Sequence, residues 1–281
     1  MQRYHDCPQV LREFLIYHEN IKGQSPLTIS EYYLDLRMFL RFIKLMRNDM
    51  PMSTNLDDID IKEIDIQFIR DIDTSDIFDF LSYLANDRAI NPDSAAPEYG
   101  ISPAARARKL SSIKSFYKYL TTRTKQLQEN PVADLEYPKL RKSLPKYLTM
   151  EQSAALLKSV SGQNEKRDYA ILMLFLNCGI RRSELVNLNL SDVYEDRIRV
   201  IGKGNKERVV YFNARTKLHL QQYLDERTDD NPALFVSLHS PHTRLTISGV
   251  EVRIRELGKS LSMPKVHPHK FRRTLATMAI D

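Results

Sequence analysis

Residues near the middle and the end of this chain could together act on a phosphate. His269 and Arg272 are three positions apart in HPHKFRRTLATM, a spacing that places both on one face of a helix. Arg181 stands in CGIRRSELVNL, just after Gly179 and just before a predicted short helix. Two guanidinium groups and an imidazole would match the extra negative charge of a pentavalent phosphoryl transition state. These residues therefore predict a site that grips a phosphate.

Arg181 also has a second explanation, which the sequence leaves open. An arginine beside a helix start suits a bidentate grip on a phosphate. Arginines at such positions also commonly remain in water or pair with a carboxylate. Glu184, three residues later, is the candidate carboxylate, and this pair would hold the guanidinium in place.

The stretch IGKGNKERVV predicts the tip of a β-hairpin from which Lys203 and Lys206 project. The phosphate-binding loop of nucleotide-binding proteins needs Gly-Lys followed by Ser or Thr, which this stretch lacks, so we expect no bound nucleotide. A lysine on such a tip could reach a polyanion and donate a proton. An ordinary solvated turn is the alternative, and the motif alone favours that alternative.

Two histidine pairs raise the question of a metal site. His267 and His269 are two positions apart, and His239 and His242 are three apart. No cysteine or well-spaced carboxylate accompanies either pair, whereas structural zinc sites use four ligands of these kinds. We therefore expect no metal and no other cofactor.

Basic residues are concentrated in one segment of the chain. The net charge is +6, from 42 basic and 36 acidic side chains, and residues 104–125 carry seven basic side chains and no acidic one. Such a stripe can attract a polyanion by releasing its counterions, or it can be a solvated helix face. Charge alone does not decide between these. The candidate polyanion contacts are Arg106, Arg108, Lys109, Lys114 and, on the hairpin, Lys206.

The composition is that of a globular protein, with 42% hydrophobic and 28% charged residues. No apolar run is long enough to span a bilayer, and the polar start MQRYHDCPQV shows no secretory signal. Cys7 and Cys178 are distant in sequence and form no metal-type pair. These features predict a reducing, cytoplasmic setting.

The first half of the sequence predicts helices. One begins at Ser25 with a proline at its first position, and Asp73–Asp76 (DTSD) is expected to cap a second, IFDFLSYLAND. A third opens at Pro103, with its basic residues mainly off the apolar face. That apolar face consists of Leu110, Ile113, Phe116, Tyr117 and Leu120.

A proline-rich segment then divides the chain. We assign residues 5–126 to a helical N-terminal domain, 127–146 to a linker, with the boundary within 131–146, and 147–281 to a second domain. This second domain is predicted to be α+β, mainly helical with a small hairpin. Its predicted elements are a helix capped by Thr149 and Gln152, a buried helix ended by Gly179, a hairpin at 197–212 and a helix from Ile247.

The ordered motifs GIRRSEL, GKGNKER and PHKFRRTLAT resemble those of the tyrosine site-specific recombinases, above all the Xer-type enzymes and the phage or transposon integrases. The segments SPLTISEYYLDLRMFLRF and ARKLSSIKSFYKYL resemble the first and last helices of the family's core-binding domain. The resemblance runs through nearly the whole chain. It implies a SAM-like helical core-binding domain and a catalytic domain that form a two-domain clamp on duplex DNA, with the basic residues named above as DNA contacts.

The resemblance also implies roles for individual residues. Arg181 and Arg272 would clamp the scissile phosphate, Lys203 would be the general acid for the leaving 5′ oxygen, and His269 would serve in acid–base work. The reaction would pass through a 3′-phosphotyrosine without ATP or metal, and the subunits would form a homo- or hetero-tetramer on DNA. In the family the nucleophilic tyrosine lies C-terminal to the H-x-x-R helix, and this sequence ends at Asp281 before it.

The sequence is therefore expected to be a truncated form that binds DNA without cutting it, unless a partner subunit supplies the tyrosine. A non-catalytic DNA-binding or regulatory protein that kept the fold is the alternative. A type IB topoisomerase shares similar chemistry, but the Xer-like first half argues against it.

Overall fold

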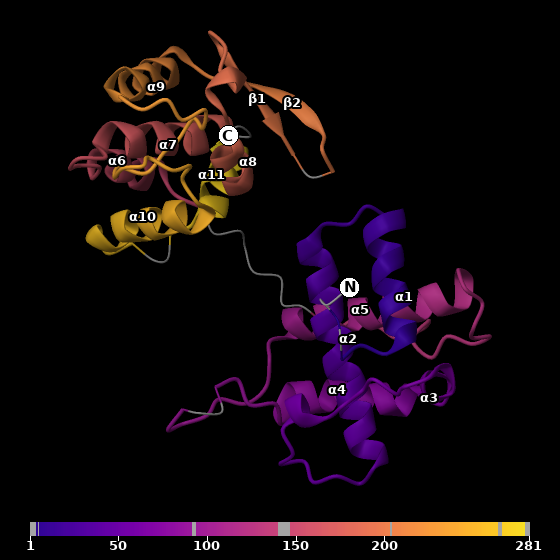
Figure 1. Ribbon diagram of the computed structural model, residues 1–281. Helices are drawn as coiled ribbons and strands as arrows, with labels where there is room; N and C mark the ends of the chain where they lie inside the picture. The colour runs from indigo at the N-terminus through magenta and orange to yellow at the C-terminus, as the bar shows by residue number, and fades with distance from the viewer. Residues whose placement is uncertain are drawn as a thin grey trace. The chain divides into compact units, whose positions relative to one another are not determined.

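The computed structural model describes residues 4, 6–91, 94–139, 147–202, 204–263 and 266–278. The chain forms two compact units, Met1–Lys142 and Ser143–Asp281, which Figure 1 colours from indigo to yellow along the sequence. The division lies inside the range 127–146 that the sequence assigns to a linker. Within the described ranges, no helix combines the length and the apolar character needed to cross a membrane.

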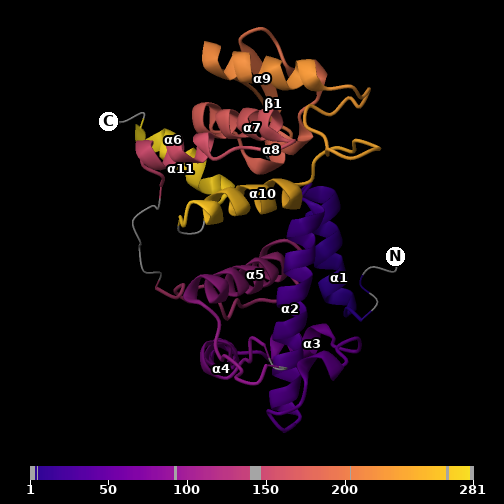
Figure 2. The same cartoon turned by 90° about the vertical axis from the view of Figure 1, so that its left-hand side faces the viewer.

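The described part of the N-terminal unit is built from helices, and its strand-type pairing is limited to a single β-bridge between Ala89 and Tyr99. The longest helix, α2, packs against α5, and α1 and α4 also contact both (Figure 2). The α-helices are α1 (Gln9–Ile16), α2 (Pro26–Arg47), α3 (Ile66–Arg70), α4 (Thr74–Asn86) and α5 (Pro103–Thr122).

Side chains cap these helices where the sequence predicted. The Ser25 hydroxyl accepts a hydrogen bond from the backbone N–H of Thr28 (3.3 Å), and Pro26 occupies the first turn of α2. Asp73 and Asp76 form a reciprocal capping box at the start of α4. The predicted starts of α2, α4 and α5 are therefore confirmed.

The C-terminal unit is centred on α7, whose residues from Ala170 to Phe175 are all buried. Figures 1 and 2 both show α7 between α9 and α10. The elements are α6 (Met150–Lys158), α7 (Glu165–Cys178), α8 (Arg182–Asn187), β1 (Arg197–Ile201), β2 (Glu207–Tyr211), α9 (Ala214–Glu226), α10 (Ile247–Ser260) and α11 (Pro268–Met278). The predicted fold class, mainly helical with a small hairpin, is confirmed.

Strands β1 and β2 pair antiparallel, with Ile198 opposite Val210 and Val200 opposite Arg208. Because side chains alternate between the two faces of a strand, these four residues share the inner face of the hairpin. Ile198 and Val200 are buried there. Arg208 is thus a charged residue on a mostly apolar face.

A buried carboxylate ties α2 to α5. The Asp35 side chain is fully buried and accepts hydrogen bonds from Arg108 (2.7 Å), Lys109 (2.9 Å) and the hydroxyl of Ser112 (2.8 Å). The prediction that Lys109 lies off the buried face of its helix is wrong, because Lys109 is only 5% exposed. Its ammonium group is the internal counter-ion of Asp35. Arg108 is half-exposed and also pairs with Glu31.

We predict that Asp35→Ala lowers the free energy of unfolding by about 3–5 kcal/mol, because it leaves the Lys109 ammonium buried without a partner. Urea denaturation followed by circular dichroism measures the loss. Glu31→Gln is the control, since it removes an exposed partner of Arg108 and should cost less than about 1 kcal/mol. Equal losses for the two variants would contradict the assigned role of Asp35.

Candidate active site

The turn after α7 depends on Gly179. This residue has a left-handed backbone, with φ +56°. A Cβ atom at this position would lie 2.8 Å from the Leu275 side chain on α11. Glycine therefore satisfies two requirements, the backbone conformation and the close approach of α11.

Arg272 on α11 fastens the same turn. Its Nη1 donates a hydrogen bond to the carbonyl oxygen of Gly179 (2.7 Å). One residue before Arg272, Phe271 stacks on Phe175 of α7, with ring centroids 5.7 Å apart. Arg181 follows Gly179 by two residues, so the structure brings the two predicted phosphate-binding arginines to one turn.

Arg181 is held by Glu184. The Arg181 Nη1 donates to Glu184 Oε1 (2.8 Å), and the backbone N–H of Arg181 donates to Glu184 Oε2 (2.7 Å). The predicted pairing of Arg181 with Glu184 is therefore confirmed. The Arg181 side chain remains 44% exposed, so pairing with Glu184 does not withdraw it from solvent.

A second arginine, which the sequence did not predict, also binds the Glu184 carboxylate. Arg208 on β2 donates from Nη1 to Oε1 (2.7 Å) and from Nη2 to Oε2 (2.8 Å). The available signal was the alternation of β2, which turns Arg208 toward the inner face of the hairpin. Alternation alone does not reveal which carboxylate lies opposite.

The Glu184 side chain is almost completely buried, with 1% exposed. Burial by itself raises the pKa of a carboxyl group, but the hydrogen bonds from Arg208 and Arg181 outweigh burial and lower the pKa of Glu184 to about 2. Glu184 is therefore negatively charged at neutral pH and lies between two guanidinium groups.

The remaining predicted catalytic residues have less defined surroundings. His269 is exposed on α11, one turn before Arg272. Lys203 lies outside the described residues, so its predicted place at the site stays a prediction. Its neighbour Gly202 is described, and a Cβ there would lie 3.4 Å from Glu184 Oε1. The strand end that precedes Lys203 thus lies beside the Glu184 carboxylate.

Known proteins are similar to this chain in sequence and in fold. A profile of the phage integrase family matches residues 146–280. Tyrosine recombinase XerC of Caldanaerobacter subterraneus subsp. tengcongensis is 41% identical over 277 residues, covering 96% of this chain and 75% of that protein. XerC of Leptospira interrogans is 31% identical over 281 residues, covering 97% and 80%. This chain belongs to the tyrosine recombinases.

Solved recombinases support the same fold. The XerH site-specific recombinase bound to its difH substrate, in a pre-cleavage complex, matches with a TM-score of 0.62 and 20% identity. That match covers 96% of this chain and 72% of the XerH chain. A λ integrase dimer bound to a COC′ core site matches with a TM-score of 0.63 and 14% identity, covering 95% and 88%. This tyrosine recombinase therefore has the fold of these two solved recombinases.

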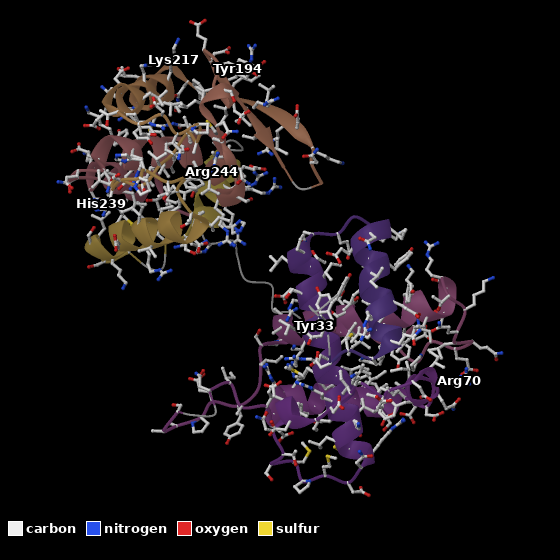
Figure 3. The ribbon with its side chains drawn as sticks, in the orientation of Figure 1. Tyr33, Arg70, Tyr194, Lys217, His239 and Arg244 are labelled. Atoms are coloured by element: carbon white, nitrogen blue, oxygen red, sulfur yellow. The ribbon has the colours of Figure 1, made fainter. Side chains whose placement is uncertain are left out.

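The C-terminal end of α8 is anchored independently of the arginine cluster, which consists of Arg181, Arg208 and Arg272. Arg244, labelled in Figure 3, donates from Nη1 to the carbonyl oxygens of Val186 (2.8 Å) and Leu188 (2.9 Å). At the other end, Arg182 pairs with Glu251 of α10. Both ends of α8 are therefore held, which fixes the helix that carries Glu184.

The predicted polyanion-contacting residues outside this cluster differ in how far other parts of the fold already engage their side chains. Lys206 is exposed on the hairpin turn. Lys114 donates to the carbonyl oxygen of Ala133 (3.3 Å), and its ammonium lies 5.3 Å from the centre of the Tyr137 ring. Arg106 is half-buried, and its Nε has no hydrogen-bond partner within the described part of the chain.

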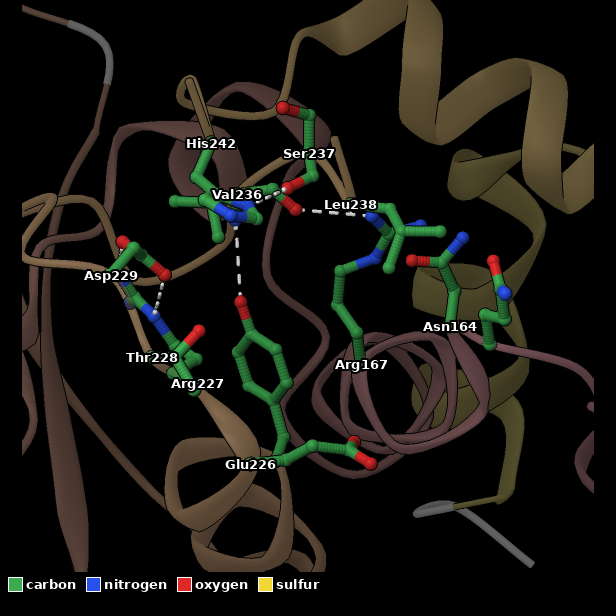
Figure 4. Close-up of a pocket in the computed structure, with 12 residues that line it drawn as sticks. Asn164, Arg167, Glu226, Arg227, Thr228, Asp229, Val236, Ser237, Leu238 and His242 are labelled. Carbon is green, nitrogen blue, oxygen red and sulfur yellow. Dashed lines mark hydrogen bonds and ion pairs between the residues drawn. The ribbon is translucent and has the colours of Figure 1, made fainter. Parts of the chain in front are cut away.

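A cavity of about 150 Å³ between α7, α9 and the loop after α9 is separate from the arginine cluster (Figure 4). Two of its polar side chains already bind the backbone of Val236: Arg167 donates to the carbonyl oxygen (3.0 Å), and the Tyr223 hydroxyl accepts from the N–H (3.3 Å). Arg227 in its wall pairs with Asp229. No group of three or more metal-ligating side chains occurs among the residues the structure describes.

We predict that Glu184→Gln makes the stability of the protein less dependent on acid pH. The pKa of Glu184 is lowered to about 2 from an ordinary 4.5, so its contribution is complete above pH 4.5 and is lost as the pH falls toward 2. At neutral pH the substitution should cost about 1–3 kcal/mol, because charge-assisted hydrogen bonds are lost. Denaturant titrations of both proteins at several pH values measure the difference. A difference that does not shrink as the pH falls below 4.5 would contradict the assignment.

Proposed function

We propose that this chain binds duplex DNA and that Arg181 and Arg272 hold a single backbone phosphate for strand exchange. The observation that carries this proposal is the hydrogen bond from Arg272 to the carbonyl of Gly179, two residues before Arg181 (2.7 Å). Each guanidinium uses Nη1 to bind the fold. In this proposal their other N–H groups hold the ligand, and phosphate matches the planar fork of donors that arginine presents.

The proposed reaction is a transesterification. A tyrosine oxygen attacks the phosphorus, a 3′-phosphotyrosine forms, and the bond to the 5′ oxygen breaks. Lys203 donates the proton that the leaving 5′ oxygen takes up, and His269 accepts the proton that the attacking tyrosine hydroxyl gives up. Arg181 and Arg272 stabilise the added charge on the pentavalent phosphorus. Since one phosphoester replaces another, the step needs neither ATP nor metal.

The N-terminal unit is proposed to be the core-binding domain of a two-domain clamp. Arg106, Arg108 and Lys114 on α5 and Lys206 on the hairpin are its proposed DNA contacts. Lys109 is left out, since its ammonium group is buried against Asp35. Related structures support DNA as the partner, because XerH was solved bound to its difH substrate and λ integrase bound to a COC′ core site. We also propose that the subunits assemble as a homo- or hetero-tetramer on DNA and act in the cytoplasm.

The salt dependence of DNA binding is the first test. If the chain neutralises several phosphates, the logarithm of its affinity should fall linearly with the logarithm of salt concentration, with a slope of about −0.9 per phosphate contact. Fluorescence anisotropy of a labelled duplex at increasing sodium chloride measures the slope. Affinity that stays flat with salt would contradict the clamp.

Substitution of the two arginines is the second test. In a form of the protein that carries the nucleophilic tyrosine, Arg181→Ala and Arg272→Ala should each slow strand cleavage by about a hundredfold to a thousandfold, with a smaller loss of DNA binding. Covalent protein–DNA adducts on a denaturing gel report cleavage. Arg215→Ala on α9, which removes a bond to the Tyr169 hydroxyl, is the matched control. Binding losses as large as the cleavage losses would refute the transition-state role, and binding without any adduct would favour a regulatory DNA-binding protein.

A further inference from the structure

The Glu184 carboxylate receives more donors than the anchoring of Arg181 requires. It accepts two hydrogen bonds from Arg208, one from the Arg181 side chain and one from the Arg181 backbone, all between 2.7 and 2.8 Å. Arg208 gives both of its terminal nitrogens to the carboxylate, whereas Arg181 gives only Nη1. The two arginines therefore share Glu184 unequally.

This unequal sharing has a physical consequence for Arg181. A buried carboxylate with a single arginine partner is best satisfied by a two-pronged salt bridge. Without Arg208, Glu184 would draw a second N–H group from Arg181 and turn the guanidinium inward. With Arg208 in place, both carboxylate oxygens are already occupied, and the Arg181 side chain remains 44% exposed.

We propose that Arg208 is a positioning residue that satisfies Glu184 and thereby keeps the Arg181 guanidinium available for the DNA phosphate. This inference rests on the proposed function. Arg208 acts through Glu184 rather than on the DNA, because both of its terminal nitrogens are engaged with the carboxylate. The hairpin thus supplies a counter-ion to the α8 turn as well as the lysine-bearing tip.

The test is DNA binding by this chain, with a duplex that the unaltered protein selects from a random-sequence pool. Arg208→Gln removes the counter-ion. Arg197→Gln is the matched control, because Arg197 lies on the outer face of the same hairpin, where it pairs with Asp196 and lies over the Tyr194 ring. We expect Arg208→Gln to lower affinity about tenfold more than the control does, which corresponds to about 1.4 kcal/mol.

A double-mutant cycle separates an action through Glu184 from direct contact with DNA. In a Glu184→Gln background no carboxylate remains to capture Arg181, so Arg208→Gln should then cost no more than Arg197→Gln. An undiminished cost in that background would show that Arg208 touches the DNA itself, and it would overturn the proposal.

A pH series supplies a readout that a merely structural role would not change. In Arg208→Gln the pKa of Glu184 should rise from about 2 toward or above its ordinary 4.5, because burial then meets fewer opposing hydrogen bonds. Lowering the pH from neutral to 4.5 should protonate Glu184, release Arg181 and shrink the affinity deficit relative to the control. Other charged groups on neighbouring elements have their own partners: Arg182 with Glu251, Arg199 with Asp192, and Arg272 with the Gly179 carbonyl.

The outcomes are distinguishable. An affinity deficit that disappears in the Glu184→Gln background and shrinks at low pH supports the proposal. A deficit equal to that of the control, or one that does not change with pH, overturns it. If the unaltered chain selects no duplex, the proposed function itself fails. If circular dichroism shows Arg208→Gln unfolded, Arg208→Lys replaces it, with a smaller deficit and the same pH trend expected because lysine keeps the charge but not the two-pronged geometry.

Discussion

The hydrogen bond between the Arg272 guanidinium and the Gly179 carbonyl is the contact on which the rest of the site depends. It joins the end of α7 to α11, two elements that are far apart in sequence. It requires the left-handed backbone and the missing Cβ of Gly179, which let Leu275 approach. Since Arg181 lies two residues after Gly179, the same contact brings two positive charges, which would otherwise repel each other, to one turn.

Buried carboxylates organise the basic residues throughout this chain. Isolated buried charges are costly, so each carboxylate needs cations from its surroundings, and each therefore joins separate parts of the fold. Lys109 is withdrawn from the surface in this way, whereas Arg108 and Arg181 stay partly exposed beside their carboxylates. The pairs are Asp35 with Arg108 and Lys109, Asp168 with Arg167 and Arg253, and Glu184 with Arg181 and Arg208.

Local signals made much of this architecture predictable. Caps such as Asp73 and the glycine at 179 act within a few residues, so α4 and the end of α7 could be located from sequence. The burial of Lys109 could not be predicted from the sequence, because a charged residue is normally expected to face solvent. In the structure Lys109 lies with the buried apolar residues of α5. Arg208 was missed for a related reason, since its partner Glu184 lies 24 residues away and only the folded chain brings them together.

A crystal structure of this chain bound to duplex DNA tests the central claim most directly. If the Gly179 turn holds both arginines for a single phosphate, one backbone phosphate will accept hydrogen bonds from Arg181 and Arg272 together, with Arg208 still paired to Glu184. Arginines on different phosphates, or guanidinium groups turned away from the DNA, would contradict the account.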